Sequence, residues 1–340
     1  MTLGIDGAMR LRAAALGLLV MPSAAAAHHS HGEFSGETYE IEGQLASVVW
    51  RNPHPAFTLR LANGDGQDEI WRVQVQGNVN GLKRDGVSGD RFVVGERVRI
   101  EGHLSTRRPT LLLATRARLA DGTEIILGPD ESSGSALYRR SAAASDPQAT
   151  AQVRGLFRVW TVASRVRTQD LPLNEAARSA KAAWDSLLDD PQRGCRPLGM
   201  PGAMMSPHPI EFLQAADEII LHLEEWDAIR TIHSASGNGI GNHDPTPMGH
   251  SVGRWEGDTL VVTTTHIDYP YLDEHGTPQS AAVEVVERFT LSADERSLNW
   301  TATVSDPGTL TEPVVAFTTR WEWVPGEEIQ RYDCAELDPL

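Results

Sequence analysis

Hydrophobic and polar residues alternate with a period of two through much of residues 37–128, which is the pattern of half-buried β-strands. The clearest runs are "YEIEGQLASVVW", "AFTLRLANGDGQDEIWRVQV" and "ERVRIEGHLS", and the second contains the hairpin signal Asn63-Gly64-Asp65-Gly66. The segment "GNVNGLKRDG" predicts a helical turn between the third and fourth strands, and "LLLATRARLADGTEIIL" adds two strands. Five or six strands with one interposed helix predict a small closed barrel of the OB type.

Residues 129–152 are polar, small and aperiodic, as is typical of a linker. The second predicted domain covers residues 153–340. One helix is predicted within "PLNEAARSAKAAWDSLLDD", because Asn174 precedes an amphipathic, alanine-rich run. The strands that follow are predicted at Glu218–Leu223, Ala228–His233, Thr259–Thr265, Val283–Leu291, Leu298–Val304, Val315–Trp323 and Ile329–Cys334.

Turns such as "WEGD", "SADERS" and "VPGEE" join nearly all of these strands without crossover helices. This favours an antiparallel up-and-down barrel, because closure removes exposed sheet edges. The segment "GLFRVW" resembles the Gly-x-Trp opening of lipocalin-like barrels. We therefore expect an all-β protein with one or two helices, in which an OB-like barrel precedes a lipocalin-like barrel. A half-barrel or an open sandwich is the alternative for the second domain.

The N-terminus has the pattern of a secretory signal peptide. Arg10 and Arg12 precede the apolar run Ala13–Met21, and residues 23–27 offer Ala-x-Ala cleavage sites. A signal peptide is thus predicted over residues 1–27, with cleavage after Ala26 or Ala27, and a histidine-rich mature N-terminus over residues 28–36. The apolar run is too short for a permanent membrane span, and no later segment is apolar enough for one. We expect a periplasmic protein.

The sequence contains two cysteines, Cys195 and Cys334. In an oxidising compartment such a pair usually forms a disulfide, and the alternative is two separate buried thiols. A disulfide would join the start of the second domain to its last predicted strand.

The negative charge is concentrated in the second domain. Residues 37–128 carry 12 basic and 12 acidic side chains, whereas residues 153–340 carry 14 basic and 29 acidic ones. The second domain thus has a net charge of −15, nearly all of the −16 of the whole chain. Such a domain repels polyanions, so nucleic acid is not expected as a partner. A neutral or cationic small molecule fits this charge better.

The motif Gly249-His250-Ser251-Val252-Gly253 fits the G-x-S-x-G pattern of serine hydrolases. A nucleophile elbow requires a strand before the serine and a helix after it. Here "NHDPTPM" precedes the motif, and its two prolines exclude a central strand. The following "RWEGDTLVVTTT" predicts a hairpin and a strand. We therefore interpret Ser251 as a strand or turn residue.

Two sets of motifs resemble known families. The segments "MGHSVGRWEGDTLVV", "VERFTLS", "VSDPGTLTEP" and "YDC" resemble an exported bacterial family of unknown function, over residues 155–336. The segments "HHSHGEF" and "VVWRNPHPAFTLRL" resemble another exported family of unknown function, over residues 28–127. This chain departs slightly from the second pattern by the additional His31 and Pro55. Both resemblances support two domains, and neither implies an activity.

Histidines near the mature N-terminus are candidate metal ligands. If cleavage follows Ala27, the α-amine and imidazole of His28 can chelate a metal together, with His29, His31 or His54 adding nitrogens. If cleavage follows Ala26, the third residue is a histidine, and the amine, backbone amides and imidazole can enclose Cu(II) or Ni(II). These ligands suit Cu(II). The alternative is a solvated tail that binds metal incidentally.

His250, Glu287 and Asp306 are the candidate catalytic residues of the second domain. Alternation places Glu287 on a mostly apolar strand face, where burial would raise the pKa of the carboxyl group, as in a general acid or base. The alternative is a structural salt bridge between Glu287 and Arg254 or Arg320 of neighbouring strands.

Seven of the nine tryptophans lie in the second domain. Large aromatic side chains can line an apolar cavity, and the alternative is that they form the core. The candidate ligand-binding residues are Trp255, Phe317, Trp321, Tyr332 and Arg254.

Three functions are consistent with these features. The first is an exported protein that binds a small, mostly apolar, neutral or cationic molecule in the C-terminal barrel. The second is a lyase, isomerase or hydrolase that acts on a small molecule in that barrel. The third is a periplasmic copper-binding protein. The sequence specifies neither the ligand nor a protein partner.

Overall fold

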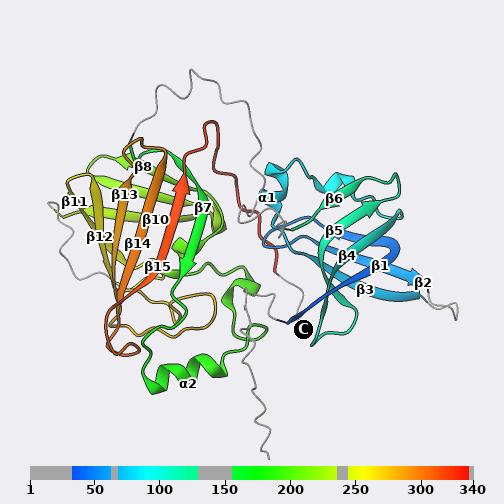
Figure 1. Ribbon diagram of the computed structural model, residues 1–340, viewed down its shortest axis with the longest axis horizontal. Helices are drawn as coiled ribbons and strands as arrows, with labels where there is room; N and C mark the ends of the chain where they lie inside the picture. The colour runs from blue at the N-terminus through cyan, green and yellow to red at the C-terminus, as the bar shows by residue number, and fades with distance from the viewer. Residues whose placement is uncertain (1–32, 63–67, 129–154, 236–243, 337–340) are drawn as a thin grey trace, which may run out of the picture.

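The computed structural model describes residues 33–62, 68–128, 155–235 and 244–336, which form two β-domains (Figure 1). The predicted signal peptide, the hairpin turn at residues 63–66 and the linker at residues 129–152 lie outside the described residues. The N-terminal domain contains β1 (Phe34–Val49), β2 (Ala56–Ala62), β3 (Asp68–Val75), α1 (Val79–Arg84), η2 (Gly89–Arg91), β4 (Arg97–Ser105), β5 (Leu111–Leu119) and β6 (Glu124–Ile126).

The N-terminal strands close into a ring in the order β1-β2-β3-β5-β4, because β3 pairs with β5 in parallel and β1 pairs with β4. The predicted helical turn is confirmed as α1, whose first turn is capped by the Asn78 carboxamide accepting from the Gly81 N–H at 2.7 Å. This strand order and helix position agree with the predicted OB-like barrel. Val73 and Val75 of β3 lie in the core, so Arg72 and Gln74 point to the outer face.

The C-terminal strands form a closed barrel in the order β10-β11-β12-β13-β14-β15-β7-β8-β9. The predicted strand ends agree with the observed ones to within one residue, apart from the Ile329–Cys334 segment treated below. The strands are β7 (Val159–Arg167), β8 (Ile210–Ala215), β9 (Glu218–Leu223), β10 (Ala228–Ser234), β11 (His250–Glu256), β12 (Thr259–Thr265), β13 (Glu284–Leu291), β14 (Ser297–Ser305) and β15 (Val314–Glu322).

The predicted helix is α2 (Glu175–Ala183), which lies outside the barrel near one of its ends (Figure 1). Asn174 caps it, as expected, by accepting a hydrogen bond from the Ala177 N–H at 2.9 Å. Three short 3₁₀ helices follow: η5 (Pro191–Gly194), η6 (Gly202–Met205) and η7 (Glu225–Asp227).

The barrel departs from the predicted up-and-down topology at one point, because β10 and β11 pair in parallel. Parallel neighbours need a crossover connection rather than a tight turn, and residues 235–249 are long enough to provide one. Crossover connections are usually recognised in a sequence by the pattern of a helix. Residues 235–249 are rich in glycine and proline and have no such pattern, so the parallel pairing was not predicted.

The predicted last strand, Ile329–Cys334, is not part of the barrel. The chain leaves the barrel after β15 and crosses to the N-terminal domain (Figure 1). There the Asn52 N–H donates to the Asp333 carbonyl and the Ala335 N–H donates to the Asn52 carbonyl, both at 2.8 Å. The period-two pattern correctly indicated an extended chain, but this chain pairs with a loop of the other domain. We call residues 324–336 the C-terminal segment.

Candidate ligand-binding site

Glu287 lies inside the C-terminal barrel, in an ion pair with Arg230 of β10. The guanidinium donates to Glu287 Oε1 at 3.0 Å and also contacts Oε2, and the two side chains are 1% exposed or less. Trp300 Nε1 donates to the same carboxylate at 3.0 Å. Arg230 donates further to Ser251 Oγ at 3.0 Å and to Thr264 Oγ1 at 2.7 Å. This network matches the structural salt bridge that was the alternative to catalysis.

The expected partner of Glu287 was wrong. Arg254 and Arg320 lie on the outer surface, where they pair with Glu256 at 2.7 Å and with Glu322 at 3.1 Å. Side chains of a strand alternate between its faces, and both arginines occupy the outward positions of their strands.

Aromatic side chains fill the middle of the barrel. Phe317 and Trp321, two predicted ligand-binding residues, are 1% and 0% exposed. Their rings lie 6.5 Å and 5.9 Å from the ring of Trp300. Trp160 and Phe212 are also 0% exposed. These five side chains belong to one cluster of buried hydrophobic residues. They form the core, which was the alternative expectation.

The Gly-His-Ser-Val-Gly motif leads into strand β11 and forms no nucleophile elbow, as expected. Ser251 faces the interior, where its hydroxyl lies 3.0 Å from Thr264 Oγ1. His250 points to the opposite side of the strand, and its ring stacks on His233 with centroids 4.9 Å apart. His250 and Glu287 therefore lie on opposite sides of the barrel wall.

Asp306 organises loops at one end of the barrel. Its carboxylate accepts hydrogen bonds from the Ser280 N–H and the Thr309 hydroxyl, both at 2.7 Å. The strand register places Ser305 level with His250 but three strands away, which is about 14 Å at ~4.8 Å per strand. The structure does not bring the three predicted catalytic residues together.

The other predicted ligand-binding residues lie far from the barrel core. Trp255 is 50% exposed near the end of β11, and Arg254 is exposed beside it. Tyr332 is buried in the C-terminal segment, with its ring 5.3 Å from that of His208 and 5.0 Å from that of Trp226. The predicted set therefore does not surround one space.

Of the predicted metal ligands, His28 and His29 lie outside the described residues, whereas His54 follows β1 in the N-terminal domain. Burial of the imidazole lowers the pKa of His54 to about 4, although hydrogen bonds with the backbone of residues 75–77 act to raise it. Within the described ranges, no three His, Cys, Asp or Glu side chains gather in a way that could hold a metal ion. Copper binding stays a prediction for the N-terminal histidines.

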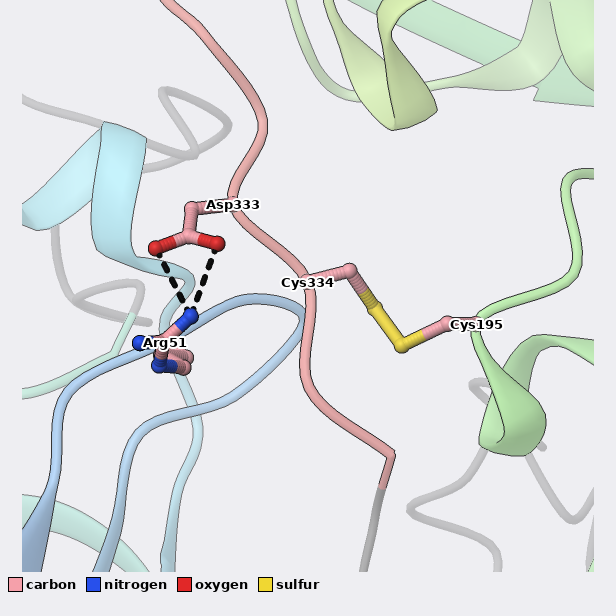
Figure 2. Close-up of a disulfide and its surroundings, with 4 residues drawn as sticks. All are labelled: Arg51, Cys195, Asp333 and Cys334. Atoms are coloured by element: carbon pink, nitrogen blue, oxygen red, sulfur yellow. Dashed lines mark hydrogen bonds and ion pairs between the residues drawn. A yellow bond between two sulfur atoms is a disulfide. The ribbon is translucent and has the colours of Figure 1, made fainter.

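Cys195 and Cys334 form the predicted disulfide, which ties the C-terminal segment to the end of η5 (Figure 2). Next to it, Arg51 Nη1 donates to the two carboxylate oxygens of Asp333 at 2.9 Å and 3.0 Å. The C-terminal segment is thus held covalently by its own domain and through hydrogen bonds by the other.

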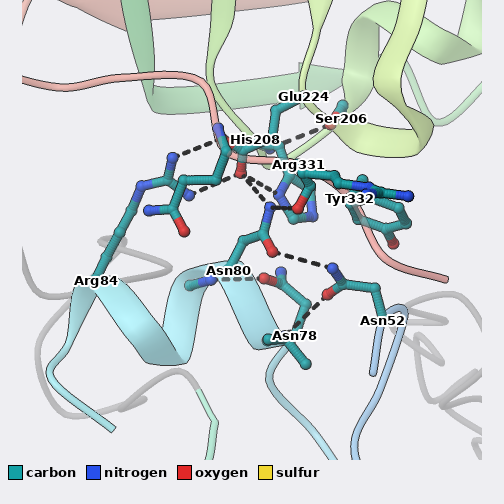
Figure 3. Close-up of polar contacts among 12 residues, drawn as sticks. Asn52, Asn78, Asn80, Arg84, Ser206, His208, Glu224, Arg331 and Tyr332 are labelled. Atoms are coloured by element: carbon teal, nitrogen blue, oxygen red, sulfur yellow. Dashed lines mark hydrogen bonds and ion pairs between the residues drawn. The ribbon is translucent and has the colours of Figure 1, made fainter. Parts of the chain in front are cut away.

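Glu224 is the centre of a polar network between the domains (Figure 3). Its carboxylate, which is 0% exposed, accepts from Arg84 at 2.6 Å and 2.7 Å and from Asn80 Nδ2 at 3.0 Å. The Gln330 N–H donates to it at 2.9 Å, and His208 Nδ1 lies 3.1 Å away. Burial acts to raise the pKa of Glu224, but hydrogen bonds and charge from Arg84 and His208 lower it to about 2.

Asn52 of the Asn-Pro-His motif connects this network to the N-terminal barrel. Its carboxamide donates to Asn80 Oδ1 at 3.0 Å and accepts from the Val79 N–H at 2.9 Å. Its backbone pairs with the C-terminal segment, as described above. This asparagine therefore joins the loop after β1, helix α1 and the C-terminal segment.

A cleft of about 190 Å³ lies on the outer face of the N-terminal barrel. Its lining includes outward side chains of β2 and β3 and the loops after β1 and β4, which are the parts that OB barrels use for binding. β1 and β5 contribute Ser47, Val49 and Leu111, and η5 and the C-terminal segment contribute Arg193, Ala335 and Glu336. We call it the arginine cleft, because its polar lining includes Arg51, Arg72, Arg108 and Arg193, together with His54 and Gln74.

Two buried donors of the arginine cleft lack a protein acceptor. Gln74 is 7% exposed, and its Nε2 has no hydrogen-bond partner among the described residues. The same is true of the buried Nη1 of Arg193. In contrast, Arg108 pairs with the buried Glu33, and Arg51 pairs with Asp333. Two side chains that line the cleft thus carry a buried donor that has no protein acceptor among the described residues.

Sequence reasoning identified His54 but missed the rest of this cleft. One signal was available in "WRVQV", where Arg72 and Gln74 alternate with two valines on a strand of a predicted OB-like barrel. Two polar residues side by side on the face that such barrels use for binding favour a site there.

Comparison with known proteins supports an N-terminal domain of unknown function. Residues 15–110 match a family model described as "Family of unknown function (DUF6152)", and the match ends at the residue before β5. No curated protein matches this chain. Within the part of the chain that the structure describes, no helix has both the length and the apolar character to cross a bilayer.

Proposed function

We propose that this is an exported protein that binds a small molecule in the arginine cleft. The observation that carries the proposal is that Gln74 and Arg193, which line one cavity from two different domains, each have a buried donor without a partner among the described residues, Nε2 and Nη1 respectively. A buried donor without an acceptor costs about 1–3 kcal/mol. Other buried donors of the described residues, for example Trp321 Nε1, also lack a partner, but these two belong to residues of one cleft, which favours a ligand that supplies the acceptors.

The size of the cleft favours a small ligand. Its volume of about 190 Å³ is below the ~300–1,000 Å³ that is usual for pockets that take drug-sized molecules. The lining combines charged groups with apolar atoms of Val49, Ala56 and Leu111. A molecule with a polar group and a compact apolar part matches this lining.

The C-terminal barrel has a supporting role in this proposal. Buried aromatic side chains occupy its middle, and a ligand in this barrel stays a prediction. The barrel domain supplies Arg193 and the C-terminal segment to the cleft, and it positions both through the disulfide and the Glu224 network.

Export is supported by the leader pattern of residues 1–27 and by the disulfide, since stable disulfides are typical of oxidising compartments. N-terminal sequencing of the protein purified from its own periplasm tests this part. A mature start at residue 27 or 28 is expected, and protein that retains Met1 or Met9 would contradict export.

Crystallography of the processed protein, soaked with small organic molecules of different charge, tests the binding proposal. Bound molecules are expected in the arginine cleft, and Ala56→Phe should abolish binding because Ala56 lines the cleft. Ala62→Phe, at the exposed far end of β2, is the matched control. Molecules bound only elsewhere, or binding unaffected by Ala56→Phe, would overturn the proposal.

A further inference from the structure

We propose that the ligand of the arginine cleft is a small organic acid, whose carboxylate accepts hydrogen bonds from Arg193 and Gln74. This inference rests on the proposed function and specifies the chemical class of the ligand. Three features of the cleft lead to it: the balance of charges, the donors that lack acceptors and the apolar part of the lining.

The side chains that line the cleft carry an excess of positive charge. Four guanidinium groups line it, against the carboxylate of Glu336 in the lining and those of Glu33 and Asp333, which pair with two of the arginines. His54 adds no charge at neutral pH, because burial lowers its pKa to about 4. The charges of Asp190 and Glu33 also act on Arg193 from outside the lining. The lining itself combines four guanidinium groups with one carboxylate, so its local charge favours an anion.

The two donors without acceptors are suited to a carboxylate. Burial lowers the pKa of the Arg193 guanidinium, and the charge of Arg108 acts in the same direction, so a nearby anion would stabilise Arg193. A guanidinium can donate two parallel hydrogen bonds to one carboxylate. Gln74 contributes a neutral donor from the opposite domain, and it donates to an anion without competing for a proton.

The apolar lining distinguishes an organic acid from an inorganic anion. Val49, Ala56 and Leu111 line the same cleft as the arginines. These side chains gain from contact with carbon atoms of a ligand at ~25 cal/mol per Å² of apolar surface that is buried. Phosphate or sulfate would satisfy the donors but would leave this surface in contact with water.

The acidic character of the whole protein does not prevent anion binding here. Charges on the surface are screened over a Debye length of ~8 Å at physiological ionic strength. The guanidinium groups line the cleft itself, so their attraction acts at contact distance. Local charge therefore dominates over the net charge of −16.

Isothermal titration calorimetry of the processed full-length protein tests the inference with three probes: benzoate, its neutral analogue benzamide, and inorganic phosphate. We expect benzoate to bind at least about tenfold more tightly than benzamide, the effect of losing a charged hydrogen bond. We also expect benzoate to bind more tightly than phosphate. Benzoate affinity should fall as the salt concentration rises.

Two variants and two matched controls locate the binding. Arg193→Gln and Gln74→Met each remove one donor and should weaken benzoate binding about tenfold or more. Arg320→Gln and Gln214→Met replace the same residue types on the exposed barrel surface, and they should leave the affinity unchanged. Circular dichroism and thermal unfolding check that each variant is folded.

The outcomes separate this inference from the proposed function. If benzamide or phosphate binds in the cleft as tightly as benzoate, the inference of an organic acid is wrong, but the cleft is still a binding site for small molecules. If benzoate binds equally well to Arg193→Gln and Gln74→Met, the assigned contacts are wrong. If soaked crystals and titration find no molecule in the cleft, both proposals fail.

Discussion

Arg230 in the C-terminal barrel and the half-buried Arg193 in the arginine cleft show two environments of an arginine side chain. The guanidinium of Arg230 is 1% exposed and contacts Glu287, Ser251 and Thr264. The guanidinium of Arg193 has a buried Nη1 without a protein acceptor and lies near the like charge of Arg108. The first site is complete within the protein, whereas the second lacks an acceptor.

This difference indicates that the buried polar groups of the barrel stabilise the fold, whereas those of the arginine cleft are available for ligand binding. A buried charge is tolerated when a partner and hydrogen bonds replace water, and removing that partner is strongly destabilising. A donor that is left unsatisfied reduces stability, so it is expected where it contributes to binding instead. We therefore expect substitutions in the barrel network to change stability and substitutions in the cleft to change ligand binding.

The largest expected effect is that of removing the disulfide with Cys195→Ser and Cys334→Ser. The loop it closes spans 139 residues, so the chain-entropy relation gives a loss of about 5 kcal/mol in the free energy of unfolding. Urea denaturation measures this loss. Benzoate affinity should also fall, because the C-terminal segment and Arg193 lose their covalent connection. Unchanged benzoate affinity in the folded variant would contradict a role of the disulfide in shaping the cleft.

Glu287→Gln should lower the free energy of unfolding by about 3–5 kcal/mol, because it leaves the charge of Arg230 buried without a partner. Benzoate binding should be unchanged, since Glu287 does not line the cleft. Denaturation and titration of the same sample measure both quantities. Glu322→Gln, in an exposed ion pair, is the control and should change stability by less than about 0.5 kcal/mol. A Glu287→Gln variant that keeps its stability but loses benzoate binding would show that Glu287 acts in ligand binding and not in stabilising the fold.

His54 should make stability depend on pH. Its folded pKa of about 4 lies below the ~6.5 of an unfolded histidine, so the unfolded chain binds a proton that the folded chain excludes. The contribution of His54 is complete above about pH 6.5 and is lost as the pH falls towards 4.

Between about pH 7 and pH 5, the free energy of unfolding of the wild type should fall by about 1–2 kcal/mol more than that of His54→Asn. This range allows for the partial exposure of the imidazole ring. Glu224, with a pKa of about 2, does not titrate in this range. Denaturation at several pH values measures the difference, and parallel pH profiles for the two proteins would show that His54 has an ordinary pKa.

The smallest expected effect has the opposite sign. Gln74→Met removes a buried donor without an acceptor, so the free energy of unfolding in the absence of ligand should stay the same or rise by up to about 1 kcal/mol. Thermal unfolding with and without benzoate measures this change and the loss of ligand stabilisation. Gln214→Met is the control. A clear loss of stability would show that Gln74 has a structural role.

Much of the fold could be predicted from period-two alternation. Strands β9 and β12 begin and end at the predicted residues, and Asn174 was recognised as a helix cap. The parallel pairing of β10 with β11 could not be predicted, because alternation identifies a strand but not its neighbour. For the same reason Glu287 was recognised as an inward residue, whereas its partner Arg230, on a strand that is not adjacent to it, was not.

The candidate site was much harder to predict. The arginine cleft combines outward residues of β3, the loops after β1 and β4, and Arg193 from the other domain. These segments are far apart in the sequence and share no motif. The disulfide between Cys195 and Cys334 was predicted, but its position beside the cleft depends on the C-terminal segment pairing with Asn52.

The most direct measurement is the position of a heavy-atom probe in crystals of the processed protein soaked with para-bromobenzoate. We expect an anomalous bromine signal in the arginine cleft, with the carboxylate at Arg193 and Gln74 and no signal in the C-terminal barrel. A signal inside or at an end of the barrel, with the cleft empty, would contradict it.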